Sequence, residues 1–139
     1  MNVFMSYCTE EKGVAEDIVE YLRRMFRPDD LKVFISSSRD SIDIGDEWQE
    51  KIIKELKKAD ALLVLMSWRA LSNLWVNFEI GIAWAREARI LMFCHKGLSE
   101  GDLPSPYRSL QVESLTGLDD IERNQKVAKV VERTLVLCL

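Results

Sequence analysis

One acidic residue stands out in an otherwise uncharged helical pattern. Glu79 is the only ionisable side chain in the segment Leu74–Ala85 (LWVNFEIGIAWA), where the other positions are apolar, small or amide. At helical spacing Glu79 lies one turn beyond Trp75 and among aliphatic groups. A helix that is apolar almost all round is normally buried, and a buried carboxylate either changes its pKa or acquires hydrogen-bonding partners. Because perturbed carboxylates concentrate at functional sites, Glu79 is the first candidate for chemistry.

A simpler interpretation of Glu79 is structural. The carboxylate would then lie at the edge of the buried face, pair with Arg86 two turns on, and only solubilise the helix. The aromatic residues also have a structural interpretation, because Tyr7, Trp48 and Trp68 are of types that more often pack in a core than bind a ligand. Trp75 differs from them, since it precedes the acidic position by one turn.

Other chemistry-bearing patterns are weak. The glycines form neither GxGxxG nor GxxxxGK, so ordinary dinucleotide-fold or P-loop phosphate binding is not expected. His95 is the only histidine, and its neighbour Cys94 points to the opposite side of a strand, so we interpret His95 as a packed strand end. Cys8, Cys94 and Cys138 form no CxxC pair, so the sequence predicts neither a disulfide framework nor a metal site.

Strand and helix patterns alternate along the chain. Helical spacing of apolar residues predicts helices near 14–25, 48–56, 74–85 and 119–137. Short apolar runs predict five strands, at Asn2–Tyr7, Lys32–Ser36, Ala61–Ser67, Arg89–His95 and Leu110–Leu115. Such alternation predicts an α/β fold of three layers, a five-stranded parallel sheet covered on both faces, in the flavodoxin-like order 2-1-3-4-5.

This topology predicts where a ligand would bind. The strand order reverses between the first and third strands, so a crevice is expected at their carboxyl ends, near Ser6–Cys8 and Ser67–Arg69. The helix that carries Glu79 begins a few residues beyond Ser67, over the same crevice. The polar stretch Ser37–Gly45 is longer than a simple connection needs, and is a second candidate for function.

Composition restricts the class of protein. The 139 residues are 47% hydrophobic, enough for one domain with its own core, and the formal net charge of −4 argues against a nucleic-acid partner. No signal peptide is recognisable, and the longest apolar run is too short to span a bilayer, so we expect a cytoplasmic protein without a membrane partner. The last residues are strongly apolar, and we hypothesise that residues 1–139 are the N-terminal domain of a longer protein whose remainder covers Leu135, Val136 and Leu137.

Several short motifs, taken together and in this order, resemble a Toll/interleukin-1 receptor (TIR) domain over nearly the whole chain. They are VFMSY at 3–7, KVFIS at 32–36, the run Ile44, Gly45, Asp46, Glu47, Trp48, then Ala59 and Asp60, LLVLMS at 62–67, and Ser72, Trp75 and Glu79. The resemblance implies a flavodoxin-like fold. For the bacterial, plant and axonal members that carry the helix glutamate, it also implies cleavage of NAD+ between nicotinamide and ribose.

The resemblance also implies roles for individual residues. Glu79 corresponds to the family's catalytic glutamate, and Ser37–Gly45 to the loop that covers the pocket. Substrate contacts are expected from Tyr7, Arg39, Gly45, Ser72 and Trp75, with Trp75 against the dinucleotide and Arg39 at a phosphate. No metal or cofactor is implied, because NAD+ is itself the substrate.

One carboxylate can suffice for this reaction. The ribose develops oxocarbenium character as nicotinamide leaves neutral, and the products are nicotinamide with ADP-ribose or a cyclic isomer. Such domains work when assembled, and Val76, Ile80 and Trp84 are expected either to form an assembly surface or to pack inside the monomer. We expect a sensor domain after this one and a role in bacterial antiphage defence. The alternatives are a non-catalytic scaffold in signalling and, more weakly, recycling of another nucleotide.

Overall fold

The computed structural model describes residues 1–36 and 46–137. Five strands alternate with helices over these residues, and the strands pair in parallel in the order β2-β1-β3-β4-β5, as predicted. The strands are β1 (Asn2–Ser6), β2 (Lys32–Ile35), β3 (Ala61–Met66), β4 (Arg89–Cys94) and β5 (Gln111–Ser114). Each begins at or within one residue of its predicted start.

The main helices are also close to the predicted segments. They are α1 (Lys12–Met25), α2 (Asp46–Lys58), α4 (Leu74–Ala85) and α5 (Asp120–Val131), whereas the short α3 (Trp68–Leu71) was not predicted. One turn of 3-10 helix, η1 (Thr9–Glu11), joins β1 to α1, and one π-helical segment, η4 (Glu132–Val136), continues α5. Asp119 starts α5 through a reciprocal capping box with Glu122, which satisfies backbone N–H groups at the helix start.

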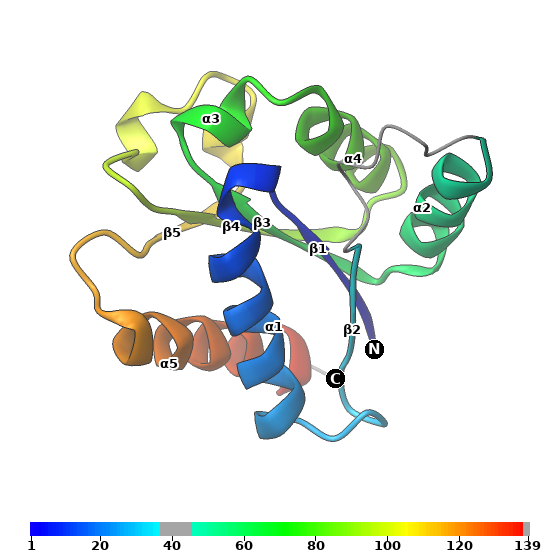
Figure 1. Ribbon diagram of the computed structural model, residues 1–139, viewed down its shortest axis with the longest axis horizontal. Helices are drawn as coiled ribbons and strands as arrows, with labels where there is room; N and C mark the ends of the chain where they lie inside the picture. Colours follow the sequence, from blue (N-terminus) through cyan, green and yellow to red (C-terminus); the bar gives the residue numbers. More distant parts are fainter. Residues whose placement is uncertain (37–45, 138–139) are drawn as a thin grey trace.

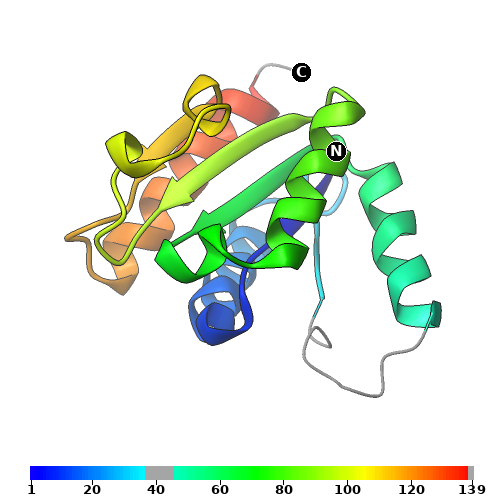
Figure 2. The same cartoon turned by 90° about the horizontal axis from the view of Figure 1, so that it is seen from above.

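The sheet forms the middle of three layers (Figure 1). Helices α1 and α5 cover one face, and α2, α3 and α4 cover the other, as the view from above in Figure 2 also shows. Strand β3 lies at the centre and is buried at every position, which explains its continuous apolar sequence ALLVLM. Right-handed crossovers put α1 and α4 on opposite faces, because the chain moves across the sheet in one direction from β1 to β2 and in the other from β3 to β4.

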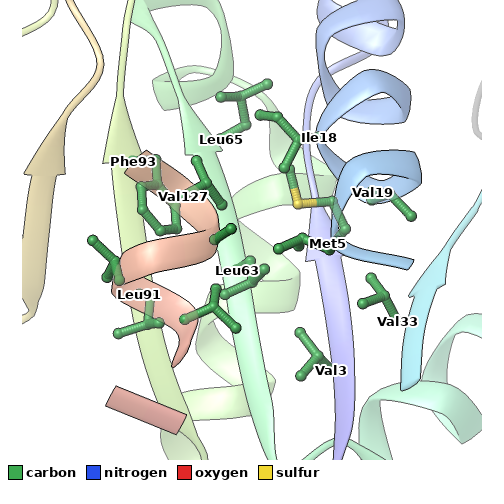
Figure 3. Close-up of a cluster of buried hydrophobic side chains, with 14 of the residues drawn as sticks. Val3, Met5, Ile18, Val19, Val33, Leu63, Leu65, Leu91, Phe93 and Val127 are labelled. Carbon is green, nitrogen blue, oxygen red and sulfur yellow. The ribbon is translucent and has the colours of Figure 1, made fainter. Parts of the chain in front are cut away.

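The two faces of the sheet have separate apolar cores. Figure 3 shows the core under α1 and α5, which contains Val3 and Met5 of β1, Ile18 of α1 and Val127 of α5. The core on the opposite face contains Phe4 and the buried side chains of α2 and α4. Because side chains alternate along a strand, consecutive residues of β1 belong to different cores, and this decides which of them can reach α4.

The apolar residues near the end of the described chain differ in burial. Leu135 is buried and Val136 partly buried in the core under α1 and α5, so this domain itself covers them, whereas Leu137 is 70% exposed. Within residues 1–36 and 46–137, no helix combines the length and the apolar character needed to cross a membrane.

Candidate active site

Helix α4 presents Glu79 to the sheet. The helix begins after Asn73, whose side chain accepts a hydrogen bond from the N–H of Val76 at 3.0 Å. This start sets the rotation of the helix, so that Val76, Glu79, Ile80 and Ala83 form its buried side. Glu79 has 0% exposed surface. A carboxylate is therefore held away from bulk water, as the isolated acid in an apolar helix predicts.

Ser6 holds the buried carboxylate. It is the last residue of β1 and lies on the face that α4 covers, and its Oγ donates to Oε1 of Glu79 at 2.7 Å. Both side chains are 0% exposed, although 73 positions separate them in the sequence. A hydroxyl that donates to a carboxylate forms one of the stronger kinds of hydrogen bond in proteins. Glu79 thus reaches the carboxyl end of β1, where a crevice was expected, but the sequence did not single out Ser6 as its partner.

The structural interpretation of Glu79 proposed an ion pair with Arg86, and this pairing is wrong. Arg86 lies two turns beyond Glu79, but its Nη1 donates to the backbone carbonyls of Leu56 at 2.6 Å and Ala59 at 3.2 Å. Those carbonyls lie at the end of α2 and just beyond it, where helices leave backbone acceptors without partners in the helix. Arg86 therefore connects α4 to the end of α2 by hydrogen bonds. The Glu79 carboxylate is buried without an ion pair to Arg86.

Three aromatic rings of α2 and α4 contact one another. The Trp75 ring contacts Trp48 edge-on with centroids 5.0 Å apart, and Phe78 edge-on at 5.7 Å. A hollow of about 640 Å³ opens next to them, lined by Gln49, Leu74, Trp75 and Phe78. Trp48 was expected to be a core residue, and it does pack partly against the core while its ring also supports Trp75. This hollow is mostly apolar, which suits a flat heterocycle.

The remaining predicted substrate residues lie elsewhere. Tyr7 is 1% exposed in the core under α1 and α5, on the opposite side of β1 from Ser6, and its hydroxyl donates to the carbonyl of Ser36. This position links β1 to β2 and points the ring away from α4. Ser72 is exposed at the end of α3. Arg39, Gly45 and the whole loop Ser37–Gly45 lie outside the described residues.

Of the two alternatives for the apolar residues of α4, packing inside the monomer is correct for Val76 and Ile80. Val76 is 0% exposed and Ile80 is 1% exposed, so both pack inside the monomer. Their direction follows from the helix rotation that buries Glu79. The apolar residues that α4 does expose are Leu74, Phe78 and Trp84, on its outer side.

A second buried acid lies beyond the end of β1. It was not among the site residues predicted from the sequence. Glu11 is 1% exposed in η1, with its Oε2 3.1 Å from Nε2 of His95 and its Oε1 4.0 Å from Nζ of Lys96. Burial raises the pKa of Glu11, but hydrogen bonds from His95 and Ser67 and the charge of His95 outweigh it, so the pKa lies below its ordinary value. The sequence did contain a signal for this pair: an acid and the only histidine follow two strands whose carboxyl ends share one edge of a parallel sheet.

The thiol of Cys8 belongs to the same group of side chains. Burial, the nearby charge of Glu11 and hydrogen bonds to Glu11 and Glu10 raise the pKa of Cys8 to about 12, although a hydrogen bond with Ser67 acts in the opposite direction. A thiol of this kind stays protonated and is a poor nucleophile. Among residues 1–36 and 46–137, no three His, Cys, Asp or Glu side chains are arranged to hold a metal ion.

The geometry around Glu79 suits one kind of chemistry. A desolvated carboxylate that is oriented by a hydroxyl can stabilise a positive charge that develops on a sugar ring. Low local polarity strengthens that electrostatic interaction.

Comparison with solved structures supports the fold. A CMP N-glycosidase, BcmB of Clostridium botulinum, superposes with a TM-score of 0.61 at 17% identity, covering 91% of this chain and 98% of that one. A TIR-STING receptor from C. gigas, solved with 2′,3′-cGAMP, gives 0.66 at 18% identity, covering 93% of this chain and 38% of that one. The TIR domain of the Toll-related receptor TRR-2 from Hydra magnipapillata gives 0.60 at 19% identity, covering 96% and 93%.

Sequence comparison identifies the family. No curated protein matches the chain. The family profile described as TIR domain, however, matches residues 3–131, which is nearly the whole sequence. That profile agrees with the parallel sheet in the order β2-β1-β3-β4-β5 and with the TIR folds among the solved structures. The chain therefore belongs to the TIR domain family.

Proposed function

We propose that this TIR domain is an N-glycosidase that cleaves NAD+ between nicotinamide and ribose, with Glu79 as its catalytic carboxylate. The observation that carries the proposal is the buried Glu79 side chain, which accepts a 2.7 Å hydrogen bond from Ser6 and lies one helical turn from Trp75. A carboxylate costs free energy to bury, so its place inside an apolar core favours a role beyond packing.

The reaction needs little acid catalysis. Nicotinamide leaves with the electron pair of its glycosidic bond as a neutral ring, and the ribose becomes an oxocarbenium ion that Glu79 stabilises. Water then adds at the anomeric carbon and one proton is released, which gives ADP-ribose. If the adenine ring attacks instead of water, the product is a cyclic isomer. Trp75 and the hollow beside it provide an apolar surface for one of the two rings of the dinucleotide.

The likeness to a CMP N-glycosidase supports the class of reaction. That protein, named for splitting the bond between base and ribose, shares the fold of this chain over 91% of its length. NAD+ contains the same type of bond with a better leaving group, because its nicotinamide is already positively charged. CMP is therefore the most informative second substrate to test.

Activation by self-association is part of the proposal. Glu79 has no exposed surface, so a ribose reaches it only after the packing around α4 opens. The outer side of the same helix exposes Leu74 at 86%, Phe78 at 43% and Trp84 at 36%. Contact between protomers through these residues would shift α4 and expose the carboxylate, and a sensor domain in a longer protein would control that contact. NAD+ depletion triggered in this way fits bacterial antiphage defence.

The direct experiment measures nicotinamide release from NAD+ at high protein concentration. The Glu79→Gln variant keeps the size of the side chain and removes its charge, so it should fold normally and release no nicotinamide above background. CMP and NAD+ are supplied in parallel to distinguish the two substrates. Equal release by the wild-type protein and the variant would contradict the proposal.

The exposed apolar side of α4 also supports a second candidate, a TIR module that only joins signalling partners. Such a module needs the surface formed by Leu74, Phe78 and Trp84 but not the charge of Glu79. Sedimentation of the protein with Leu74→Ser and Phe78→Ser tests the surface, while nicotinamide release tests the charge. If the protein self-associates but the assembled form cleaves neither NAD+ nor CMP, the result favours the scaffold.

A further inference from the structure

Ser6 occupies an unusual position for a hydroxyl. It ends a central strand of the sheet, pairs with Val64 of β3, and has 0% exposed surface. The apolar part of the core on this face consists of aliphatic, aromatic, thioether and thiol side chains. A buried hydroxyl without a hydrogen-bond partner costs free energy, so an aliphatic residue would pack here more favourably unless the hydroxyl served another group.

The group that it serves is Glu79. The Ser6 hydroxyl donates to Oε1 at 2.7 Å, and this hydrogen bond joins the end of β1 to the middle of α4. A strand end in a parallel sheet is a rigid support, because its backbone is hydrogen-bonded to neighbours on both sides. A donor on such a support limits the rotation of the carboxylate about its last side-chain bond.

We propose that Ser6 is a positioning residue, whose hydroxyl fixes the orientation of the Glu79 carboxylate and keeps it ionised for reaction with a ribosyl cation. This inference rests on the proposed function. Ser6 itself touches no reacting atom in this scheme, and it acts through Glu79. A donor to the charged form of an acid stabilises that form, so the loss of the donor would favour the protonated acid.

The kinetic test compares three variants with the wild-type protein. Ser6→Ala removes the donor, and kcat for nicotinamide release should fall about 10- to 100-fold with little change in KM, as expected for the loss of one hydrogen bond to a charged group. Ser6→Cys keeps nearly the same volume but donates weakly, so its kcat should lie between the two. Thr134→Val is the matched control, because it removes another buried hydroxyl, which donates to the carbonyl of Val130 at 2.6 Å on the far side of the sheet.

The pH profile separates positioning from a general loss of packing. In Ser6→Ala the acid limb of the kcat profile should move to higher pH by about one unit, since the carboxylate loses a donor to its charged form. Ser6→Cys should show a smaller shift in the same direction, and Thr134→Val none. A fall in kcat with an unchanged acid limb in Ser6→Ala would overturn the proposal, because a cavity alone lowers activity without changing the ionisation of Glu79.

A second measurement does not depend on any substrate. The side-chain carboxyl carbon of Glu79 can be followed by ¹³C NMR as pH is changed, and its resonance is assigned by its disappearance in Glu79→Gln. Titration at higher pH in Ser6→Ala than in the wild-type protein is expected, and an identical midpoint would overturn the inference about Ser6. If NAD+ is not cleaved at all but this midpoint moves, the proposed function fails while the effect of Ser6 on Glu79 stands.

Discussion

Two buried carboxylates lie at the same edge of the sheet, and their surroundings differ in kind. Glu11 lies 3.1 Å from the imidazole of His95 and 4.0 Å from the ammonium of Lys96, with Ser67 as a further donor. Glu79 accepts from the neutral hydroxyl of Ser6 and is surrounded by the apolar core under α4. Both acids are almost completely buried, so burial alone does not identify a catalytic group.

The described partners of Glu11 and Glu79 differ in charge. Basic side chains that neutralise Glu11 also reduce the field that its carboxylate could apply to a substrate cation. The cluster of Glu11, His95, Ser67 and Cys8 links the ends of β1, β3 and β4, which is a structural role. Among the described partners of Glu79, the hydroxyl of Ser6 is neutral and orients the carboxylate. We therefore propose a structural role for Glu11, beside the catalytic role proposed for Glu79.

The largest expected effect is on the rate of nicotinamide release, which should differ between variants of Glu79 and Glu11. Glu79→Gln should lower nicotinamide release at least about 100-fold, because it removes the charge that stabilises the transition state. Glu11→Gln, the matched change at the other buried acid, should keep kcat within about threefold while the protein remains folded. Both are measured with the same NAD+ assay, and folding is checked by circular dichroism. The assignment of roles is wrong if the two variants lose activity equally.

The next effect concerns stability. His95→Phe keeps a ring of similar size but leaves the Glu11 carboxylate buried without its imidazole partner, so the free energy of unfolding should fall by about 2 to 4 kcal/mol. Urea denaturation measures this change at neutral pH. Adding Glu11→Gln to His95→Phe should recover part of the loss, since the buried charge is then gone. Recovery is the decisive result, because a simple packing defect at residue 95 would not respond to Glu11.

A smaller effect depends on pH. The pKa of Glu11 is lower in the folded protein than its ordinary value of 4.5. Its ionised form therefore stabilises the fold above about pH 4.5, and this contribution is lost as pH falls through the lower folded pKa. The difference in unfolding free energy between the wild-type protein and Glu11→Gln should narrow between pH 6 and pH 3, as measured by urea denaturation. A difference that widens on acidification would contradict the lowered pKa.

The smallest effect concerns Cys8. The reactivity of its thiol tests whether the cluster of Glu11, His95, Ser67 and Cys8 has a structural role. Because its pKa is raised to about 12 and its side chain is buried, the thiol should resist iodoacetamide at pH 8 in the folded protein. Peptide mass spectrometry should find Cys8 unmodified until urea unfolds the chain. Rapid alkylation of folded protein would instead reveal an accessible, reactive thiol next to Glu11.

Much of the fold could be predicted from short-range patterns. The apolar runs at 2–7 and 61–67 and the helical spacing at 74–85 led to the correct sheet order, because burial on both faces and right-handed crossovers leave few topologies for such an alternation. Glu79 could be found in the same way, since a single charge in an apolar helix needs no knowledge of distant residues.

Contacts between distant segments could not be predicted in this way. Periodicity indicates which residues share one face of a helix or strand, but not which face meets the sheet, so it left open whether Val76 and Ile80 form a surface or pack inside the monomer, as they do. The same limit explains Tyr7, which the alternation of β1 directs into the core opposite α4.

The sequence by itself determined that strands and helices alternate, and that one carboxylate lies in an apolar helix, because both follow from local spacing. Only the tertiary structure decided that Ser6 holds Glu79 and that His95 holds Glu11, since each pair joins elements far apart in the chain. Hydrogen bonds and ion pairs act over a few ångströms, so their partners are set by how the layers pack.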